Sequence, residues 1–101
     1  MDRFRTIDSF VRVATAGSFS AAAKQLGLSR ALVSLHITDL EKRLAVRLLN
    51  RTTHSLTLTE AGASYLEFCQ RLLAEMSQQE SSLAQRQKEP RGSLEVAAPK
   101  S

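Results

Sequence analysis

The sequence of 101 residues predicts a mainly α-helical fold, a winged helix-turn-helix of three helices and a two-stranded wing, followed by one long helix. Three observations lead to this fold class. Apolar residues recur at helical spacing in three separate segments within residues 4–44. Two short runs rich in apolar and β-branched residues follow within residues 46–58. The next stretch contains no proline before Pro90, so a single long helix can form there.

The first predicted helix covers about residues 4–16. Its apolar residues are spaced i, i+3, i+4 and i+7, as on one face of an amphipathic helix: Ile7, Phe10, Val11 and Ala14. Gly17 supplies a stop directly after this stripe. The second helix is short; it begins with Ser18 or Ser20 as its N-cap and ends at Gly27.

The third helix is predicted to follow the N-cap Ser29. Its buried stripe is Val33, Ile37, Leu40 and Leu44. Its opposite face is Arg30, Ala31, Ser34, Leu35, Thr38 and Lys42. The second and third helices match a helix-turn-helix pattern, because small Ala23 permits close approach, Gly27 permits the turn, and Val33 locks the helices together. Such a motif presents the outer face of its second helix to the major groove of DNA.

The wing is predicted from two short strands, Leu48–Leu49 and Leu56–Leu58, which a polar stretch separates. Thr59 then caps the long helix, whose last residue is expected at Lys88 or Glu89 because of the following proline. About 29 residues at about 1.5 Å each give roughly 43 Å, more than a body of this size needs, so we expect the helix to project. Residues 91–99 alternate like a strand without a partner strand, as at the start of a further, truncated domain.

The long helix carries two adjacent apolar stripes, wider than one small body can cover. A second copy of the chain could bury both stripes, so we expect a dimer. The residues assigned to its interface are Tyr65, Leu66, Cys69, Leu72, Leu73, Met76 and Leu83. In the alternative interpretation, the stripes pack only on the chain's own helices. Cys69 is also interpreted as a small core hydrophobe rather than a redox sensor.

Charge is unevenly distributed along the chain. Residues 1–59 carry nine basic and four acidic side chains, a net charge of +5. Residues 60–101 carry five basic and six acidic side chains, a net charge of −1. The positive field of the first part favours a polyanionic partner such as nucleic acid, although a charge of this size also occurs in proteins with no such partner.

The composition argues against several classes of protein. A single cysteine rules out an internal disulfide and a Cys/His zinc cluster. No apolar run approaches the roughly 18 residues of a membrane helix, and no signal peptide is visible, so we expect a cytoplasmic protein without a membrane partner. The sequence has no nucleophile with a base and no phosphate-binding glycine loop. We therefore expect neither an enzyme nor a metal or cofactor site in this chain.

The sequence resembles the LysR-type transcriptional regulators over essentially residues 4–62. The matching stretches are Phe10–Ala14, Gly17–Ala23, Leu26–Ser29, Val33–Ser34 with Ile37, Leu40–Glu41, Val46–Arg51 and Leu56–Gly62. Departures lie on the predicted DNA-facing side: the family often has Gln-Pro in place of Arg30–Ala31, Arg in place of Leu35 and Gly in place of Ala45. They leave the predicted fold untouched and change the DNA sequence that we expect to be read.

The resemblance implies an organisation and a set of partners. It implies a winged helix-turn-helix DNA-binding domain at 1–59, a linker and dimerisation helix at 60–89 and the start of an effector domain at 90–101. The implied function is sequence-specific transcriptional regulation, in which a homodimer with antiparallel linker helices reads an inverted-repeat operator in double-stranded DNA. For the full-length protein it implies a small-molecule effector, and it leaves a tetramer and contact with RNA polymerase open.

Twelve residues are assigned to DNA binding: Ser18, Ser20, Ser29, Arg30, Ala31, Ser34, Leu35, Thr38, Lys42, Arg51, Thr53 and His54. Arg30 can donate to guanine O6 and N7 or to a phosphate, and Ser34 can bond to a base edge or a phosphate. Leu35 can meet a thymine methyl group or be partly buried under the wing.

The remaining polar residues are assigned to the DNA backbone. Thr38 and Lys42 are expected to contact phosphates, and the serines at the start of the second helix form a phosphate site with its free N–H groups. In the wing, Arg51 and His54 are expected at the backbone or the minor groove, with a structural ion pair as the alternative for Arg51. His36 is expected to contact solvent or phosphate.

Two alternative functions remain for the whole chain: a winged-helix regulator of another family and a winged-helix protein-interaction module.

Overall fold

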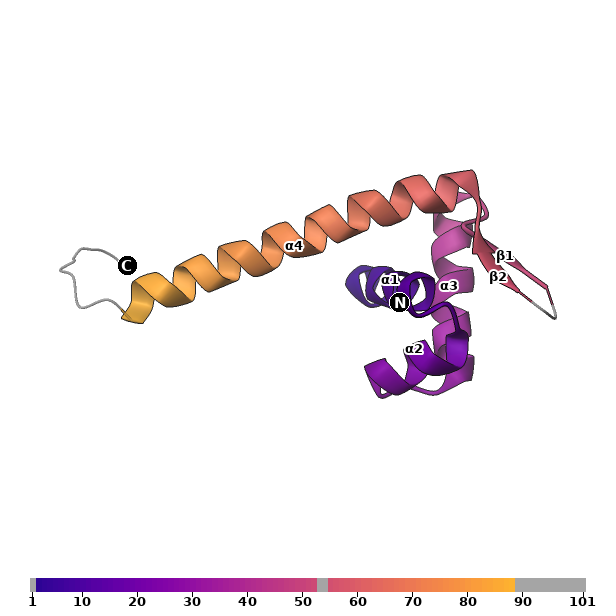
Figure 1. The fold of residues 1–101 in the computed structure, drawn as a ribbon, viewed down its shortest axis with the longest axis horizontal. Coiled ribbons are helices and arrows are strands. Elements are labelled where there is room, and N and C mark those ends of the chain that lie inside the picture. Colours follow the sequence, from indigo (N-terminus) through magenta and orange to yellow (C-terminus); the bar gives the residue numbers. More distant parts are fainter. Residues whose placement is uncertain (1, 53–54, 89–101) are drawn as a thin grey trace. The chain divides into compact units, whose positions relative to one another are not determined.

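The computed structural model describes residues 2–52 and 55–88, and its element order confirms the predicted fold class. The elements are α1 (Arg3–Ala16), α2 (Phe19–Leu26), α3 (Arg30–Leu44), β1 (Leu49–Arg51), β2 (Leu56–Leu58) and α4 (Glu60–Lys88) (Figure 1). The chain divides into two compact units, Met1–Arg71 and Leu72–Ser101, which are described separately. None of the helices in the described part of the chain combines the length and the hydropathy of a membrane span.

Short polar side chains cap the helices where the sequence predicts. The hydroxyl of Ser18 accepts the N–H of Ala21 at 3.1 Å, which makes Ser18 rather than Ser20 the N-cap of α2. The Ser29 hydroxyl caps α3 in the same way. The Thr59 hydroxyl accepts the N–H of Gly62 at 2.9 Å at the start of α4. Each cap satisfies an N–H group that the helix leaves without a backbone acceptor.

The core of the first unit is formed where α1, α2 and α3 pack against one another. Its fully or nearly fully buried side chains include Phe10, Val13, Ala22, Val33, Ile37 and Leu40. The predicted stripe of α3 is correct except at its end, because Leu44, the last residue of the helix, is 37% exposed.

His36 instead completes the buried face of α3. It is 3% exposed, and its Nδ1 lies 2.7 Å from the hydroxyl oxygen of Ser9 in α1. The expectation that His36 contacts solvent or phosphate is therefore wrong. The physical reason is helical spacing, since position 36 falls three residues after Val33 and one turn before Leu40, on the packed side of the helix.

The wing is a two-stranded antiparallel sheet whose register pairs Leu49 with Leu58 and Arg51 with Leu56. The first strand begins one residue later than predicted and extends to Arg51. Since side chains alternate along a strand, the members of these two pairs share one face of the sheet. Leu49 is buried in the core and Leu56 and Leu58 pack against it, so this face is turned toward the helices.

The start of α4 belongs to the same core. Gly62 lies so close to the backbone of Leu48 that an added Cβ would overlap the carbonyl oxygen of Leu48. Tyr65 and Leu66 are partly buried against the core, and Cys69 has no exposed surface. The assignment of Cys69 to a dimer interface is therefore corrected, because the single chain already buries this side chain completely and leaves nothing for a partner to contact.

The second unit is described as far as Lys88, within the helix α4. Its predicted interface residues include Met76 and Leu83, which are 36% and 60% exposed. Glu89 and the predicted strand after Pro90 lie outside the described residues. The predicted domain boundaries and the dimer remain predictions.

Ala45 adopts a conformation that normally favours glycine. It terminates α3 with φ 58° and ψ 38°, and it is the only residue other than glycine with positive φ among the described residues. An L-residue pays about 1–2 kcal/mol in this region, whereas glycine avoids that cost but loses more backbone entropy on folding. We expect Ala45→Gly to raise the free energy of unfolding by about 0.5–1 kcal/mol in urea titrations followed by circular dichroism.

Ala63 provides the matched control for this prediction, because it is exposed and helical within α4. Ala63→Gly should lower the free energy of unfolding by about 1 kcal/mol. A similar loss for Ala45→Gly would show that the left-handed backbone at position 45 is not a source of strain.

Candidate nucleic-acid interface

An open groove of about 560 Å³ lies between the start of α2, the first turns of α3 and the wing. Its lining residues are Gly17, Ser18, Phe19, Ser20, Arg30, Ala31, Ser34, Arg51, Thr52, Ser55 and Leu56. Six of the twelve residues predicted to bind DNA are thus brought together: Ser18, Ser20, Arg30, Ala31, Ser34 and Arg51. They come from three elements that are separate in the sequence.

The groove has a positive electrostatic character. Among the described residues, its lining includes two arginines and no aspartate or glutamate. The N-termini of α2 and α3 both lie at this groove, at Phe19 and Arg30. Helix N-termini carry partial positive charge and free N–H groups, and they bind phosphates readily. The groove therefore favours an anionic partner.

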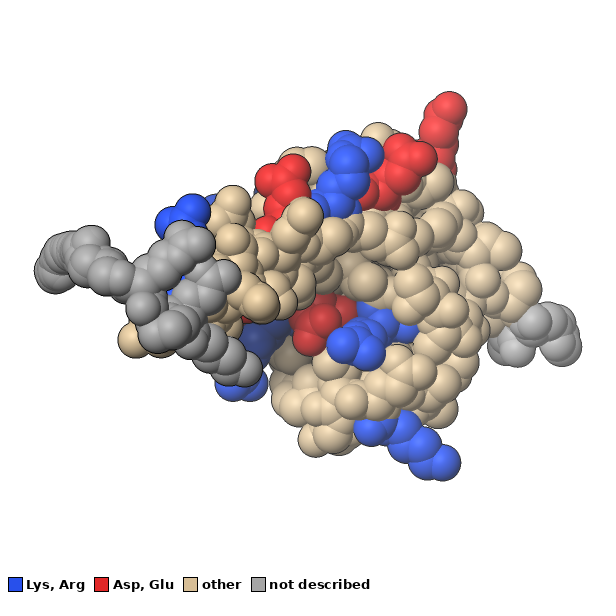
Figure 2. Space-filling model, turned by 60° about the vertical axis from the view of Figure 1, so that its left-hand side comes forward, with Lys and Arg blue, Asp and Glu red and all other residues tan. Residues whose placement is uncertain are grey.

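Two acidic side chains pair with arginines that do not line the groove. Asp8 pairs with Arg12 at 3.6 Å, and Asp39 pairs with Arg43 at 3.5 Å, each within one helix. Figure 2 shows one face of the molecule on which acidic and basic side chains lie next to each other. Among the described residues, by contrast, no carboxylate pairs with Arg30, Lys42 or Arg51, so these charges remain available to a ligand.

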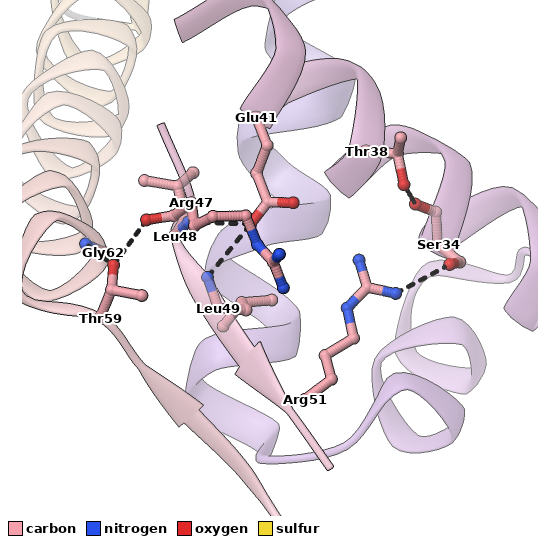
Figure 3. A network of polar contacts seen from close by, with 9 residues as sticks. All are labelled: Ser34, Thr38, Glu41, Arg47, Leu48, Leu49, Arg51, Thr59 and Gly62. Atoms are coloured by element: carbon pink, nitrogen blue, oxygen red, sulfur yellow. Dashed lines mark hydrogen bonds and ion pairs between the residues drawn. The ribbon is translucent and has the colours of Figure 1, made fainter. Parts of the chain in front are cut away.

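Two polar side chains of α3 already have partners within the chain (Figure 3). The Ser34 hydroxyl oxygen accepts a hydrogen bond from Nη1 of Arg51 at 3.4 Å. The Thr38 hydroxyl donates to the carbonyl oxygen of Ser34 at 3.1 Å. A phosphate contact donated by Thr38 would have to replace this bond, whereas Ser34 keeps its own proton for an outside acceptor.

The structure describes the surroundings of Leu35 and Arg51, for which burial under the wing and a structural ion pair were the respective alternatives. Leu35 is 57% exposed, so it is not buried under the wing. Arg51 makes no ion pair with the described residues; its guanidinium carbon lies 4.7 Å from the centroid of the Phe19 ring. The position of the Arg51 side chain is therefore set by contacts with this ring and with Ser34 rather than by a carboxylate.

Four of the other predicted residues, Ser29, Leu35, Thr38 and Lys42, do not line this groove. Thr38 and Lys42 line a second, smaller depression of about 410 Å³ toward the end of α3, together with Glu41 and Arg47. Ser29 serves as the N-cap of α3. Thr53 and His54 lie outside the described residues.

Sequence reasoning missed Thr52 and Ser55, which complete the groove on the side of the wing. Their backbones and hydroxyls are joined, with the N–H of Ser55 donating to the Thr52 hydroxyl at 2.9 Å. The available signal was their position on either side of the predicted wing residues 53 and 54.

Glu41 was also missed as a positioning residue. One carboxylate oxygen, Oε2, accepts the N–H groups of Leu48 at 2.8 Å and Leu49 at 3.2 Å (Figure 3). The Glu41 side chain is 13% exposed, and Nε of Arg47 lies 4.0 Å from the same oxygen. The contact attaches the base of the wing to α3 and thereby fixes the side of the groove that Arg51 occupies.

Comparison with known proteins identifies the family. Residues 4–63 match the family of bacterial regulatory helix-turn-helix proteins called the lysR family. The chain belongs to the lysR family. It is 47% identical over 96 residues to an HTH-type transcriptional repressor of Pseudomonas aeruginosa, covering 95% of this chain and 30% of that protein. It is 46% identical over 87 residues to the transcriptional regulator CrgA of Neisseria meningitidis, covering 86% of this chain and 29% of CrgA.

Solved structures of LysR-family DNA-binding domains have the same fold. The CbnR domain in complex with DNA is 34% identical with a TM-score of 0.74, covering 88% of this chain and all of that chain. The BenM domain bound to a catB site is 27% identical with a TM-score of 0.82, covering 88% of this chain and 98% of that chain. The chain thus matches whole DNA-binding domains but spans only about 30% of the length of the first curated relative.

Among the described residues, no three His, Cys, Asp or Glu side chains form a group that could hold a metal ion.

Burial and the neighbouring Tyr65 shift the pKa of Cys69 in opposite directions. Desolvation raises the pKa of Cys69, and a hydrogen bond from Tyr65 opposes this shift. A raised pKa keeps the thiol protonated and unreactive near neutral pH.

The role of Glu41 can be tested by removing its acceptor oxygens. Leu48 and Leu49 are each 1% exposed, so Glu41→Ala would leave two buried N–H groups without an acceptor. We expect it to lower the free energy of unfolding by about 3 kcal/mol, and Glu41→Gln, which keeps a neutral acceptor, by about 1 kcal/mol. Urea titration measures both losses.

Glu67 is the matched control, because it is exposed and pairs with Arg71 only at 4.0 Å. Glu67→Ala should change the stability by less than about 0.5 kcal/mol. Equal small losses at positions 41 and 67 would contradict the role assigned to Glu41.

Proposed function

We propose that this chain binds double-stranded DNA in a sequence-specific manner as the DNA-binding part of a LysR-family transcriptional regulator. The observation that carries this proposal is the groove in which two arginines, neither paired with a carboxylate of the described residues, meet the N-termini of two helices. In this arrangement α3 enters the major groove, and the wing contacts the backbone or the adjoining minor groove.

The residues assigned to DNA binding divide into those that contact base edges and those that contact phosphates. Arg30 lies at the first turn of α3, and it can donate two hydrogen bonds to the O6 and N7 of guanine. Leu35 offers an exposed apolar surface that fits the methyl group of thymine. Lys42 and the serines at the start of α2 are assigned to phosphates, which position the protein without reading the sequence.

A protein-interaction module is the competing function. The polar lining of the groove, with its two arginines, supports DNA rather than an apolar protein surface. No catalytic role is proposed for this chain, and its relatives bear the names of transcriptional regulators.

The rest of the proposal concerns the whole protein. We assign residues 1–59 to the DNA-binding domain, 60–89 to the linker helix and 90–101 to the start of an effector domain that senses a small molecule. Support comes from the much greater length of the relatives. We assign the protein to the cytoplasm, and the proposal leaves contact with RNA polymerase open.

A homodimer would place two copies of α3 on an inverted repeat. Its support is the apolar stripe of α4, where Met76 and Leu83 are exposed and Leu72 and Leu73 are only half-buried. The antiparallel arrangement of the two helices is what family membership favours. A tetramer of the full-length protein stays a possibility within this proposal.

The reading role of Arg30 predicts a loss of discrimination. Arg30→Ala should weaken binding to a matched operator by about 1–3 kcal/mol and relax the preference at one symmetric pair of base positions. Operators selected from a random duplex pool provide the matched site. Fluorescence anisotropy with matched, single-mismatch and random duplexes measures the effect.

Lys24 provides a control for charge alone, because it is exposed and does not line the groove. Lys24→Ala should leave the discrimination between duplexes unchanged. Equal losses for Arg30→Ala on all duplexes would reduce Arg30 to a backbone anchor, and absence of binding by the unmodified chain would overturn the proposed function.

The dimer predicts that a charge on the apolar stripe separates the two copies. Leu83→Glu should convert the dimer to a monomer, because association would bury an unpaired carboxylate. Gln78→Glu adds the same charge off the stripe and should leave the dimer intact. Sedimentation velocity at micromolar concentration distinguishes the two species, and a monomeric unmodified chain would refute the dimer.

A further inference from the structure

We propose that Phe19 is a positioning residue that holds the Arg51 guanidinium of the wing in the groove, ready to contact a DNA phosphate. This inference rests on the proposed DNA-binding function and adds to it a residue whose role is exerted through Arg51. Phe19 is 9% exposed, and its assigned role is to act through Arg51.

The register of the wing brings Arg51 to Phe19. Arg51 lies two residues after Leu49 in β1, so both side chains leave the strand on the same face. Leu49 is 1% exposed and packed in the core, which shows that this face is turned toward the helices. Arg51 is therefore directed back over the start of α2, where Phe19 is the first helical residue.

Two contacts then fix the guanidinium. Its central carbon lies 4.7 Å from the centroid of the Phe19 ring, within the range of a cation–π interaction. Its Nη1 donates to the Ser34 hydroxyl at 3.4 Å. The ring belongs to α2 and the hydroxyl to α3, so both helices of the motif contribute to the position of one wing side chain.

The held guanidinium remains able to bind an anion. It carries five N–H donors, of which one is directed to Ser34, and no carboxylate among the described residues competes for the others. The planar arrangement of its donors matches the oxygens of a phosphate. Arg51 also lines the groove with Ser18 and Ser20, which come from the same helix N-terminus as Phe19.

A phosphate contact of Arg51 leads to a specific expectation for salt dependence. Arg51→Ala should weaken matched and random duplexes by the same factor and make the slope of log affinity against log salt shallower by about one unit. Phe19→Leu keeps a buried apolar side chain but removes the ring. It should weaken both duplexes by about two- to five-fold and shift the slope in the same direction.

The double variant tests whether Phe19 acts through Arg51. In the Arg51→Ala background, Phe19→Leu should cause no further loss of DNA affinity once the fraction of folded protein is taken into account. Phe19→Tyr keeps the aromatic face and should restore the salt slope of the unmodified chain.

Phe10→Leu is the matched control, because Phe10 is fully buried and its ring contact is with Tyr65. This variant should lower the stability and leave the salt slope unchanged. A purely structural role of Phe19 would give the same result at position 19, and so would overturn the inference.

A measurement without DNA separates this inference from the proposed function. The Cδ protons of Arg51 should resonate upfield in the unmodified chain because of the Phe19 ring current, and they should return to ordinary positions in Phe19→Leu. Unshifted protons in the unmodified chain, or independent losses of affinity in the double variant, would overturn the role of Phe19 while leaving DNA binding intact. Absence of binding by the unmodified chain would instead overturn the proposed function, and with it this role.

Discussion

The two hydrogen bonds that Glu41 accepts from the backbone of Leu48 and Leu49 are the constraint on which the groove depends. The chain leaves α3 through the left-handed Ala45 and must return along the helix before it can form the wing. The carboxylate holds this returning segment on one side. On the other side, the Thr59 hydroxyl donates to the carbonyl oxygen of Arg47 at 2.6 Å (Figure 3). The Thr59 N–H donates to the carbonyl oxygen of Leu48 at 3.0 Å. Three elements are thus joined through a few backbone groups.

This fixed segment determines which side chains reach the groove. With Leu49 held in the core, the alternation of the strand places Arg51 on the same face, and the register opposite Leu56 keeps that face turned inward. A shift of one residue would direct Asn50 inward and Arg51 outward. The position of a wing arginine beside α2 and α3 therefore follows from a carboxylate that does not line the groove at all.

Local patterns were sufficient to predict the elements, and contacts between distant residues account for what they did not predict. Spacing and capping residues indicated the helices, with Ser18 and Thr59 correctly among the candidate caps. The prediction for His36 is wrong because its helical spacing places it among buried residues, where a polar ring can be accommodated by a partner, Ser9, that lies 27 residues earlier. The roles of Glu41 and Phe19 depend on partners in the wing, whose register no short stretch of sequence specifies. The prediction that Cys69 lies in a dimer interface is wrong, because helical spacing alone cannot distinguish an apolar stripe covered by the chain itself from one covered by a partner.

The two arginines of the groove differ in a way that suits two different tasks. Arg51 is held by a ring and a hydroxyl before any ligand arrives, so it would lose little side-chain freedom in the phosphate contact proposed for it. Arg30 is exposed and forms no ion pair with the described residues, so its side chain could adjust to the base edge proposed as its contact. In the proposed function, the fixed Arg51 would set the register of the protein on the DNA backbone, and the adjustable Arg30 would distinguish one base pair from another. Because the anchor is positioned through α2 and α3 together, any change that displaces the wing from these helices would weaken binding to every sequence before it altered the choice among them.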